Sequence, residues 1–239
     1  MKCPRLAAAV ACLATGSLLA GCSAPADPGP SASAASGVSA ASGAPAASVT
    51  IAIGTPRASG TPTPTTAPPP PTAAEVAAAE ALLARHGLAG RSVEEVVGAL
   101  AASTEKRPLT LQAVVKPWVL ELSDGTTKGA LPLPADRFYL AVAPYRNGNP
   151  PCSFHNLSAD QGELPNFAFH VVVADANNTP LVDADVTTGP NGFVGFWLPR
   201  DRQGLITGTV EGAAGQVGYS TRGTSPTCRF QLPLRPYRR

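Results

Sequence analysis

Two segments far apart in the chain carry side chains that can bind a soft metal ion. The first is Cys152-Ser153-Phe154-His155, where a thiol and an imidazole lie three residues apart in a loop. The second is Cys228, which we expect at the start of the last strand. Thiolates favour Cu(I), zinc and iron–sulfur clusters, and imidazole suits copper and zinc. If the last strand lies beside the loop, Cys152, His155 and Cys228 form a low-coordinate metal site that prefers Cu(I), with zinc as a second candidate.

The same two cysteines also fit a purely structural role. Outside the cytoplasm a pair of cysteines commonly forms a disulfide. A bridge from Cys152 to Cys228 would close a long loop and stabilise the fold by roughly 2–4 kcal/mol. His155 would then be an ordinary histidine of an exposed loop. The residues alone leave the metal site and the disulfide open as alternatives.

Other polar residues are weaker candidates for the site. Asp160 and Glu163 follow the cysteine loop and could accept a hydrogen bond that orients the imidazole. His170 alternates with large apolar residues, so it faces either solvent or the site. His86 is expected at the end of a helix, where the helix dipole favours its charged form.

The first residues have the layout of an export signal. Lys2 and Arg5 give a short positive segment, and Leu6–Leu19 is uncharged but too short to span a bilayer. The segment ends Leu19-Ala20-Gly21-Cys22, which resembles the bacterial lipobox. We therefore expect residues 1–21 to be a signal peptide and Cys22 to be lipidated. The mature protein is then extracytoplasmic and anchored to the bacterial cell membrane by its acyl chains.

The charge balance excludes a nucleic-acid-binding role. The chain has 18 Lys and Arg against 16 Asp and Glu. Loss of Lys2 and Arg5 with the signal peptide leaves 16 against 16. A chain without net charge has no global field that attracts a phosphate backbone.

Composition predicts three further regions after the signal peptide. Residues 22–72 are rich in Ala, Ser, Pro and Thr and predict a disordered tether. Residues 73–144 are expected to contain a helical hairpin and a β-hairpin region. Residues 145–239 are expected to form a sandwich-like region that carries the metal-binding residues. The predicted fold class is α+β, with the helical hairpin followed by a mostly antiparallel β body.

The helices and strands are predicted from caps, alternation and turn residues. The first helix covers Ala73–His86 with Gly87 after it, and the second begins at Ser92, which has the capping-box spacing to Glu95. Further strands at short spacing indicate an antiparallel sandwich. The expected strands are Ala113–Leu122 and Thr126–Leu133 around a turn at Asp124-Gly125, Arg137–Ala143 ended by Pro144, Phe167–Val173, Leu181–Thr187, Gly192–Leu198, Leu205–Glu211, Gln216–Thr221 and Thr227–Leu232.

Motifs of common enzyme classes are missing from the sequence. There is no G-x-S-x-G, phosphate loop, H-E-x-x-H or Rossmann glycine pattern. Serine hydrolases, kinases and metalloproteases are therefore unsupported. One enzyme hypothesis stays open, a cupric reductase in which Cys152 and Cys228 each give one electron and end as a disulfide.

Several segments resemble the CueP family of periplasmic copper-binding proteins, over about residues 75–234. They are His86-Gly87-Leu88-Ala89-Gly90, Ser92-Val93-Glu94-Glu95, Leu122-Ser123-Asp124-Gly125, Leu131-Pro132-Leu133-Pro134, Phe138-Tyr139-Leu140, Ala143-Pro144-Tyr145, Gly162-Glu163-Leu164, Asn191-Gly192-Phe193-Val194-Gly195-Phe196-Trp197-Leu198-Pro199-Arg200 and Pro226-Thr227-Cys228. The resemblance implies copper binding in the envelope, copper tolerance, and delivery of copper to a client such as an envelope superoxide dismutase.

The resemblance also implies a set of three copper-binding cysteines, of which this chain keeps two. The first and third fall on Cys152 and Cys228, the shared histidine falls on His155, and the middle cysteine falls on Asp160. A carboxylate in place of a thiolate weakens the preference for Cu(I) and makes Cu(II) or zinc more acceptable. Three hypotheses follow: a copper-buffering or copper-relaying lipoprotein, the cupric reductase, and a non-catalytic surface sandwich with a structural disulfide.

Overall fold

The structure is a computed structural model that describes residues 66–228 and 230–237. These residues belong to one compact unit, residues 57–239. The predicted signal peptide, the predicted lipidation site Cys22 and most of the predicted tether lie outside the described residues. None of the helices described here is long and apolar enough to cross a membrane.

Both predicted helices form, and both begin at a capping box. Helix α1 (Ala73–Arg85) follows Thr72, whose side chain accepts from the backbone of Glu75 while the Glu75 carboxylate accepts from the backbone of Thr72. Ser92 and Glu95 do the same for α2 (Val93–Ala101). Each box satisfies N–H groups that the first turn leaves without helical partners. The buried sides of both helices belong to one apolar core with the first sheet.

The first sheet is antiparallel and has the strand order β3-β2-β1-β5. Its strands are β1 (Gln112–Val115), β2 (Val119–Ser123), β3 (Lys128–Pro132) and β5 (His155–Asn156). The predicted hairpin at Asp124-Gly125 joins β2 to β3. The prediction of one continuous strand over Ala113–Leu122 was wrong. A tight turn divides it, where the Lys116 backbone N–H donates to the Val119 carbonyl and Pro117 has no N–H to offer a ladder.

The later strands form two sheets that pack against each other. The three-stranded sheet has the order β11-β4-β8, and the five-stranded sheet has the order β12-β10-β9-β6-β7. The pairing is antiparallel except between β11 and β4. The strands are β4 (Arg137–Tyr145), β6 (Ala168–Asp175), β7 (Pro180–Thr187), β8 (Val194–Pro199), β9 (Gln203–Val210), β10 (Ala213–Ser220), β11 (Phe230–Pro233) and β12 (Arg235–Pro236). The α+β prediction is confirmed.

Strand β4 was expected to end at Pro144 and instead passes through it. The ladder with β8 stops at Val142, while the parallel ladder with β11 continues through Pro144 and Tyr145. Because β8 is no longer paired at Pro144, its missing N–H leaves no partner on that side unsatisfied. The strand therefore runs longer than a proline-based rule predicts.

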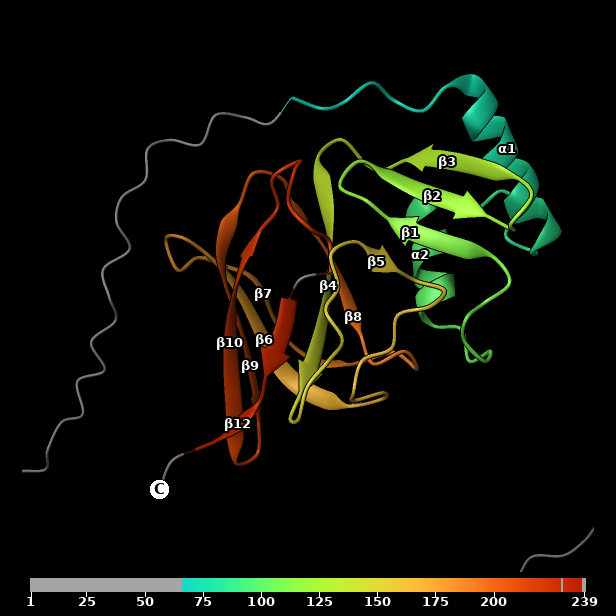
Figure 1. Cartoon of the computed structure of the whole chain (residues 1–239). Helices are drawn as coiled ribbons and strands as arrows, with labels where there is room; N and C mark the ends of the chain where they lie inside the picture. Colours follow the sequence, from blue (N-terminus) through green and yellow to red (C-terminus); the bar gives the residue numbers. More distant parts are fainter. Residues whose placement is uncertain (1–65, 229, 238–239) are drawn as a thin grey trace, which may run out of the picture. The chain divides into compact units, whose positions relative to one another are not determined.

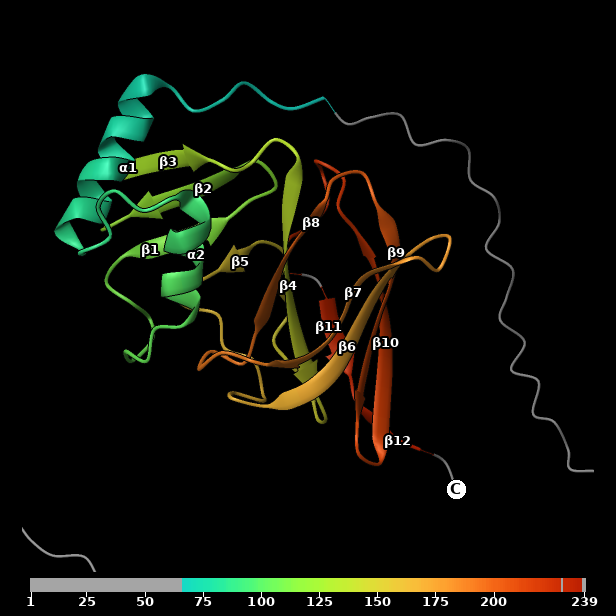
Figure 2. The same cartoon turned by 180° about the vertical axis from the view of Figure 1, so that it is seen from behind.

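Strand β4 lies between the two halves of the fold in both views (Figures 1 and 2). Its residues Phe138 to Pro144 are all buried. Phe138, Leu140 and Val142 pack in the sandwich core between the two later sheets. Tyr139 and Ala141 point to the opposite side and pack with the first sheet and the helices. A strand buried on both faces must be apolar at every position, as the sequence of β4 is.

Two loops near the cysteines touch through a pair of glycines. The Gly162 N–H donates to the Asn191 carbonyl at 2.7 Å. A Cβ built on Gly162 would lie 2.6 Å from the Gly192 carbonyl oxygen, which no real side chain tolerates. Gly192 itself has φ +79°, a conformation that favours glycine. This contact fixes the loop that carries Asp160 against the loop that carries Phe193.

We expect Gly162→Ala to lower the free energy of unfolding by about 1–3 kcal/mol, because its methyl group would press on the Gly192 backbone. Gly148→Ala is the matched control, since nothing lies within 4 Å of the added Cβ there. That control should change stability by less than about 0.5 kcal/mol. Urea denaturation of both variants measures the difference. Equal stability of the two would show that the loops can move apart freely.

The Glu163 carboxylate organises the loop that precedes the first cysteine. Its Oε2 accepts from the backbone N–H groups of Arg146, Asn147 and Gly148 at 3.0, 2.9 and 3.0 Å. Its own backbone N–H donates to the Asn149 side chain at 2.7 Å. These donors, those of Gly148 and Asn147 foremost, lower the pKa of Glu163 from 4.5 to about 2.

The lowered pKa predicts a pH-dependent contribution to stability. A carboxylate with a depressed folded pKa stabilises the protein above its ordinary pKa of 4.5, and this contribution is lost as the pH falls from there toward 2. The melting temperature of the wild type should therefore exceed that of Glu163→Gln by a constant amount well above pH 4.5. The gap should narrow as the pH falls below 4.5. Melting curves of both proteins from pH 7 to pH 2 test this, and a gap that does not narrow would contradict it.

Candidate metal centre

His155 lies in the two-residue strand β5, where it pairs with Val115 of β1. Its side chain is fully buried. The prediction of an exposed loop histidine was wrong, because β5 adds an edge to the first sheet and draws the imidazole into the core. A buried imidazole is restricted in orientation, which favours a defined interaction at one of its nitrogens.

The two predicted site cysteines meet and form a disulfide, Cys152–Cys228. Cys228 is buried and Cys152 is partly exposed. Cys228 was expected at the start of the last strand, but β11 begins at Phe230 and β12 follows it. The Cys228 N–H donates to the Ser153 carbonyl, so the two cysteine segments are also joined through their backbones.

Thr227 links the cysteine segment to three other parts of the fold. Its carbonyl accepts from the Ala141 N–H of β4 at 2.8 Å. Its hydroxyl donates to the Val115 carbonyl at 2.6 Å and accepts from the His155 N–H at 3.0 Å. Sequence reasoning did not single out this residue, although it stands beside Cys228 in one of the segments quoted for the resemblance. Buried hydroxyls with both roles satisfied position their neighbours firmly.

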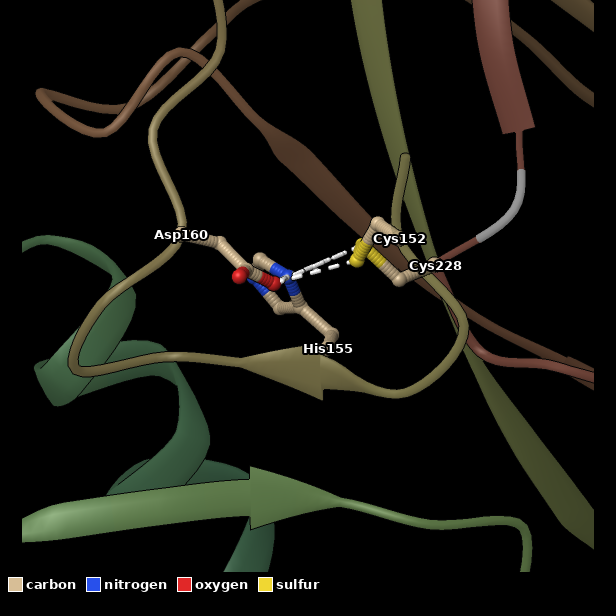
Figure 3. Close-up of side chains that lie close together, drawn as sticks. All are labelled: Cys152, His155, Asp160 and Cys228. Carbon is tan, nitrogen blue, oxygen red and sulfur yellow. Dashed lines mark hydrogen bonds and ion pairs between the residues drawn. A yellow bond between two sulfur atoms is a disulfide. The ribbon is translucent and has the colours of Figure 1, made fainter. Parts of the chain in front are cut away.

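Four potential ligand atoms converge, one each from Cys152, His155, Asp160 and Cys228 (Figure 3). All lie within 4.8 Å of one another. His155 Nδ1 is 3.5 Å from Cys228 Sγ and 3.1 Å from Asp160 Oδ2. The same Asp160 oxygen lies 3.1 Å from Cys152 Sγ. The structure thus brings the three predicted site residues together and adds Asp160 to them.

Aromatic rings enclose the imidazole. The Phe193 ring lies 4.5 Å from the His155 ring between centroids, and the Tyr139 ring is stacked at 6.2 Å. Trp197 packs edge-on against Tyr139 at 5.1 Å. Burial raises the pKa of Tyr139 well above its usual value, so its phenol stays neutral. The rings keep water away from one side of the site.

The two imidazole nitrogens have different surroundings. Nδ1 faces the Asp160 carboxylate and the sulfur of Cys228, whereas Nε2 is buried and has no hydrogen-bond partner in the described part of the chain. With a neutral ring, a proton on Nδ1 can donate to Asp160, so this tautomer is assigned from the network. The nitrogen available to a metal ion is therefore Nδ1, after it has given up that proton.

The remaining candidates lie elsewhere. His170 faces outward on β6 between Asp183 and Asp185 of β7, at 3.1 and 3.0 Å. His86 caps the end of α1, as predicted. Glu163 binds the backbone of residues 146–148 and makes no recorded contact with the imidazole. Of the two suggested acceptors, only Asp160 reaches His155.

The chemistry of this site depends on the state of the sulfurs. Bonded to each other, Cys152 and Cys228 have no thiol to lose a proton, and only the imidazole and the carboxylate remain as ordinary donors. Reduction by two electrons yields two thiols, and their thiolates then join His155 and Asp160 as donors. The reduced site therefore offers soft sulfur, borderline nitrogen and hard oxygen at one point.

Comparisons with known proteins agree with this arrangement. A crystal structure described as that of S.CueP has 40% sequence identity, covers 66% of this chain and 97% of its own, and superimposes with a TM-score of 0.63. No curated protein matches the chain. The family model of the periplasmic copper-binding protein CueP matches residues 95–233, more than half of the chain and all of the site. The chain belongs to the CueP family of periplasmic copper-binding proteins.

Proposed function

We propose that this protein is an envelope lipoprotein that binds copper, buffers or relays it at the membrane surface, and so supports copper tolerance. The observation that carries the proposal is the convergence of Cys152, His155 and Cys228 around one point. Membership of the CueP family supports copper as the cargo. The lipobox ending at Cys22 supports the membrane anchor, and the tether of residues 22–72 would give the folded part reach.

The donor set suits Cu(I) once the disulfide is reduced. Cu(I) binds few ligands and prefers thiolates, and imidazole is an acceptable third donor. His155 Nδ1 already lies 3.5 Å from Cys228 Sγ, so little movement separates the two donors from a shared ion. A copper-accepting client, such as an envelope superoxide dismutase, is part of the proposal because a partly exposed Cys152 gives a partner access to one ligand.

We expect His155→Ala to weaken Cu(I) binding by the reduced protein at least about tenfold, because one of three principal donors is lost. His170→Ala is the matched control, since that histidine lies on the outer face of β6 and should leave affinity unchanged. Competition with a chromophoric Cu(I) chelator measures both. A second variant, His155→Phe, keeps an aromatic ring against Phe193 and separates loss of the ligand from loss of packing.

Unchanged affinity in both His155 variants would remove the imidazole from the site. The cysteine pair would then be better described as a structural disulfide of a non-catalytic sandwich. That hypothesis further requires that reduction destabilises the fold without creating any affinity for copper.

A cupric reductase is the second candidate function, favoured by the disulfide itself. Two thiols and two Cu(II) ions give one disulfide, two Cu(I) ions and two protons. The Cys152–Cys228 bridge is the protein product of that reaction, and it lies beside the imidazole and carboxylate that could receive Cu(II). The metal site and the disulfide would be alternate states of one device.

Turnover distinguishes the binder from the enzyme. We expect the reduced protein to convert about two Cu(II) ions per chain and then stop, since one dithiol supplies two electrons. The double variant Cys152→Ser/Cys228→Ser gives the background from the N-terminal cysteines. Anaerobic Cu(I) formation in the presence of excess glutathione is the measurement. Sustained formation well above that background would show that the protein is an enzyme.

A further inference from the structure

Asp160 occupies the centre of the site rather than its edge. Its Oδ2 lies 3.1 Å from Cys152 Sγ, 3.1 Å from His155 Nδ1 and 3.5 Å from Cys228 Sγ (Figure 3). The Asn156 N–H donates to the same oxygen at 2.8 Å. The backbone N–H of Asp160 in turn donates to the Asn156 carbonyl. The carboxylate is therefore aimed at the other three donors by its own loop.

Hydrogen bonding accounts for only part of this placement. A sulfur in a disulfide carries no hydrogen, so the two contacts of Asp160 Oδ2 with Cys152 and Cys228 are not hydrogen bonds in the oxidised protein. Four electron-rich atoms from four residues have been brought to one point in a partly buried pocket. Such a cluster is stable only when protons or a cation separate its members.

We propose that Asp160 is a metal ligand, and that the reduced site is a four-donor centre of two cysteines, one histidine and one aspartate that binds zinc-class divalent cations as well as copper. This proposal rests on the proposed function, because it concerns the same site. It names a second class of cargo and gives the residue responsible.

The charges of the donors favour a divalent ion. Two thiolates and one carboxylate carry three negative charges, of which Cu(I) neutralises one and a divalent ion neutralises two. Zinc takes sulfur, nitrogen and carboxylate oxygen together, in a four-coordinate tetrahedral arrangement. Cu(I) uses the soft donors and leaves the carboxylate uncoordinated beside two thiolates. All four donors are thus used only by an ion of the zinc class.

The thiolates also decide which divalent ion can stay. Cu(II) takes one electron from each of two thiolates, so two Cu(II) ions leave as Cu(I) and the disulfide reforms. Zn(II) and Co(II) do not oxidise thiolates in this way. The divalent ion that stays in the reduced site is therefore a redox-inert one, with Co(II) as its spectroscopic substitute.

The test uses the full chain, reduced anaerobically by a phosphine that becomes a phosphine oxide with oxygen from water. Co(II) is added and then displaced by Zn(II). We expect the wild type to show the visible bands of tetrahedral cobalt and the near-ultraviolet bands of sulfur-to-cobalt charge transfer. Asp160→Asn should weaken Co(II) and Zn(II) binding at least about tenfold and Cu(I) binding much less. Asp183→Asn, an exposed carboxylate on β7, is the matched control and should bind Co(II) like the wild type.

A second variant keeps the test valid if Asp160→Asn disturbs its loop. Asp160→Cys replaces the carboxylate by the thiolate that the family pattern implies at this position. Because charge-transfer absorption grows with the number of thiolates, its intensity per cobalt should rise about 1.5-fold. Cu(I) binding should tighten as well. An unchanged charge-transfer intensity would show that residue 160 does not contact the metal and would overturn the proposal.

The outcomes separate this proposal from the proposed function. Wild-type protein that binds Cu(I) but not Co(II) or Zn(II) would overturn the divalent site and leave copper binding intact. Equal Co(II) affinity of the wild type and a folded Asp160→Asn would exclude Asp160 as a ligand. Failure to bind Cu(I) at all would overturn the proposed function itself. The double variant Cys152→Ser/Cys228→Ser reports the background of the remaining cysteines in every measurement.

Discussion

The burial of β4 on both faces is the constraint on which the rest of this structure depends. Alternate residues of one strand belong to two different apolar cores, one in the sandwich and one against the first sheet and the helices. The candidate site lies on the second of these sides, where Ala141 of β4 donates to Thr227 next to Cys228. The cysteine is therefore positioned by a strand that neither half of the fold can do without.

Local patterns in the sequence were sufficient to predict most of the secondary structure. The capping boxes at Thr72 and Ser92 and the alternation in β6 report interactions between near neighbours in the chain, which a sequence shows directly. Failures came where long-range pairing decided the outcome. The parallel ladder of β11 with β4 carries the strand past Pro144, and β5 is too short to show any periodicity. The domain boundaries along the folded part stay a prediction.

The site was predictable in its residue types but not in its geometry. Spacing and chemistry single out Cys152, His155 and Cys228, while only the fold shows that they meet. The burial of His155 could not be predicted, because it results from two residues pairing with β1. Asp160 was named as an acceptor for the imidazole and as the counterpart of a family cysteine. Its contacts with both sulfurs depend on how its loop is tied to Gly192, which local sequence does not encode.

The isolated Nε2 of His155 has a consequence for how long the site keeps its cargo. Metal bound at Nδ1 requires the proton of the neutral imidazole to sit on Nε2, a buried atom without an acceptor in the described part of the protein. An unsatisfied buried donor costs about 1–3 kcal/mol, which raises the dissociation constant roughly 5- to 150-fold. Such losses of affinity appear mainly as faster dissociation. For a storage protein this would be a defect, but for a carrier it shortens the residence time of the ion and eases its transfer to the next protein.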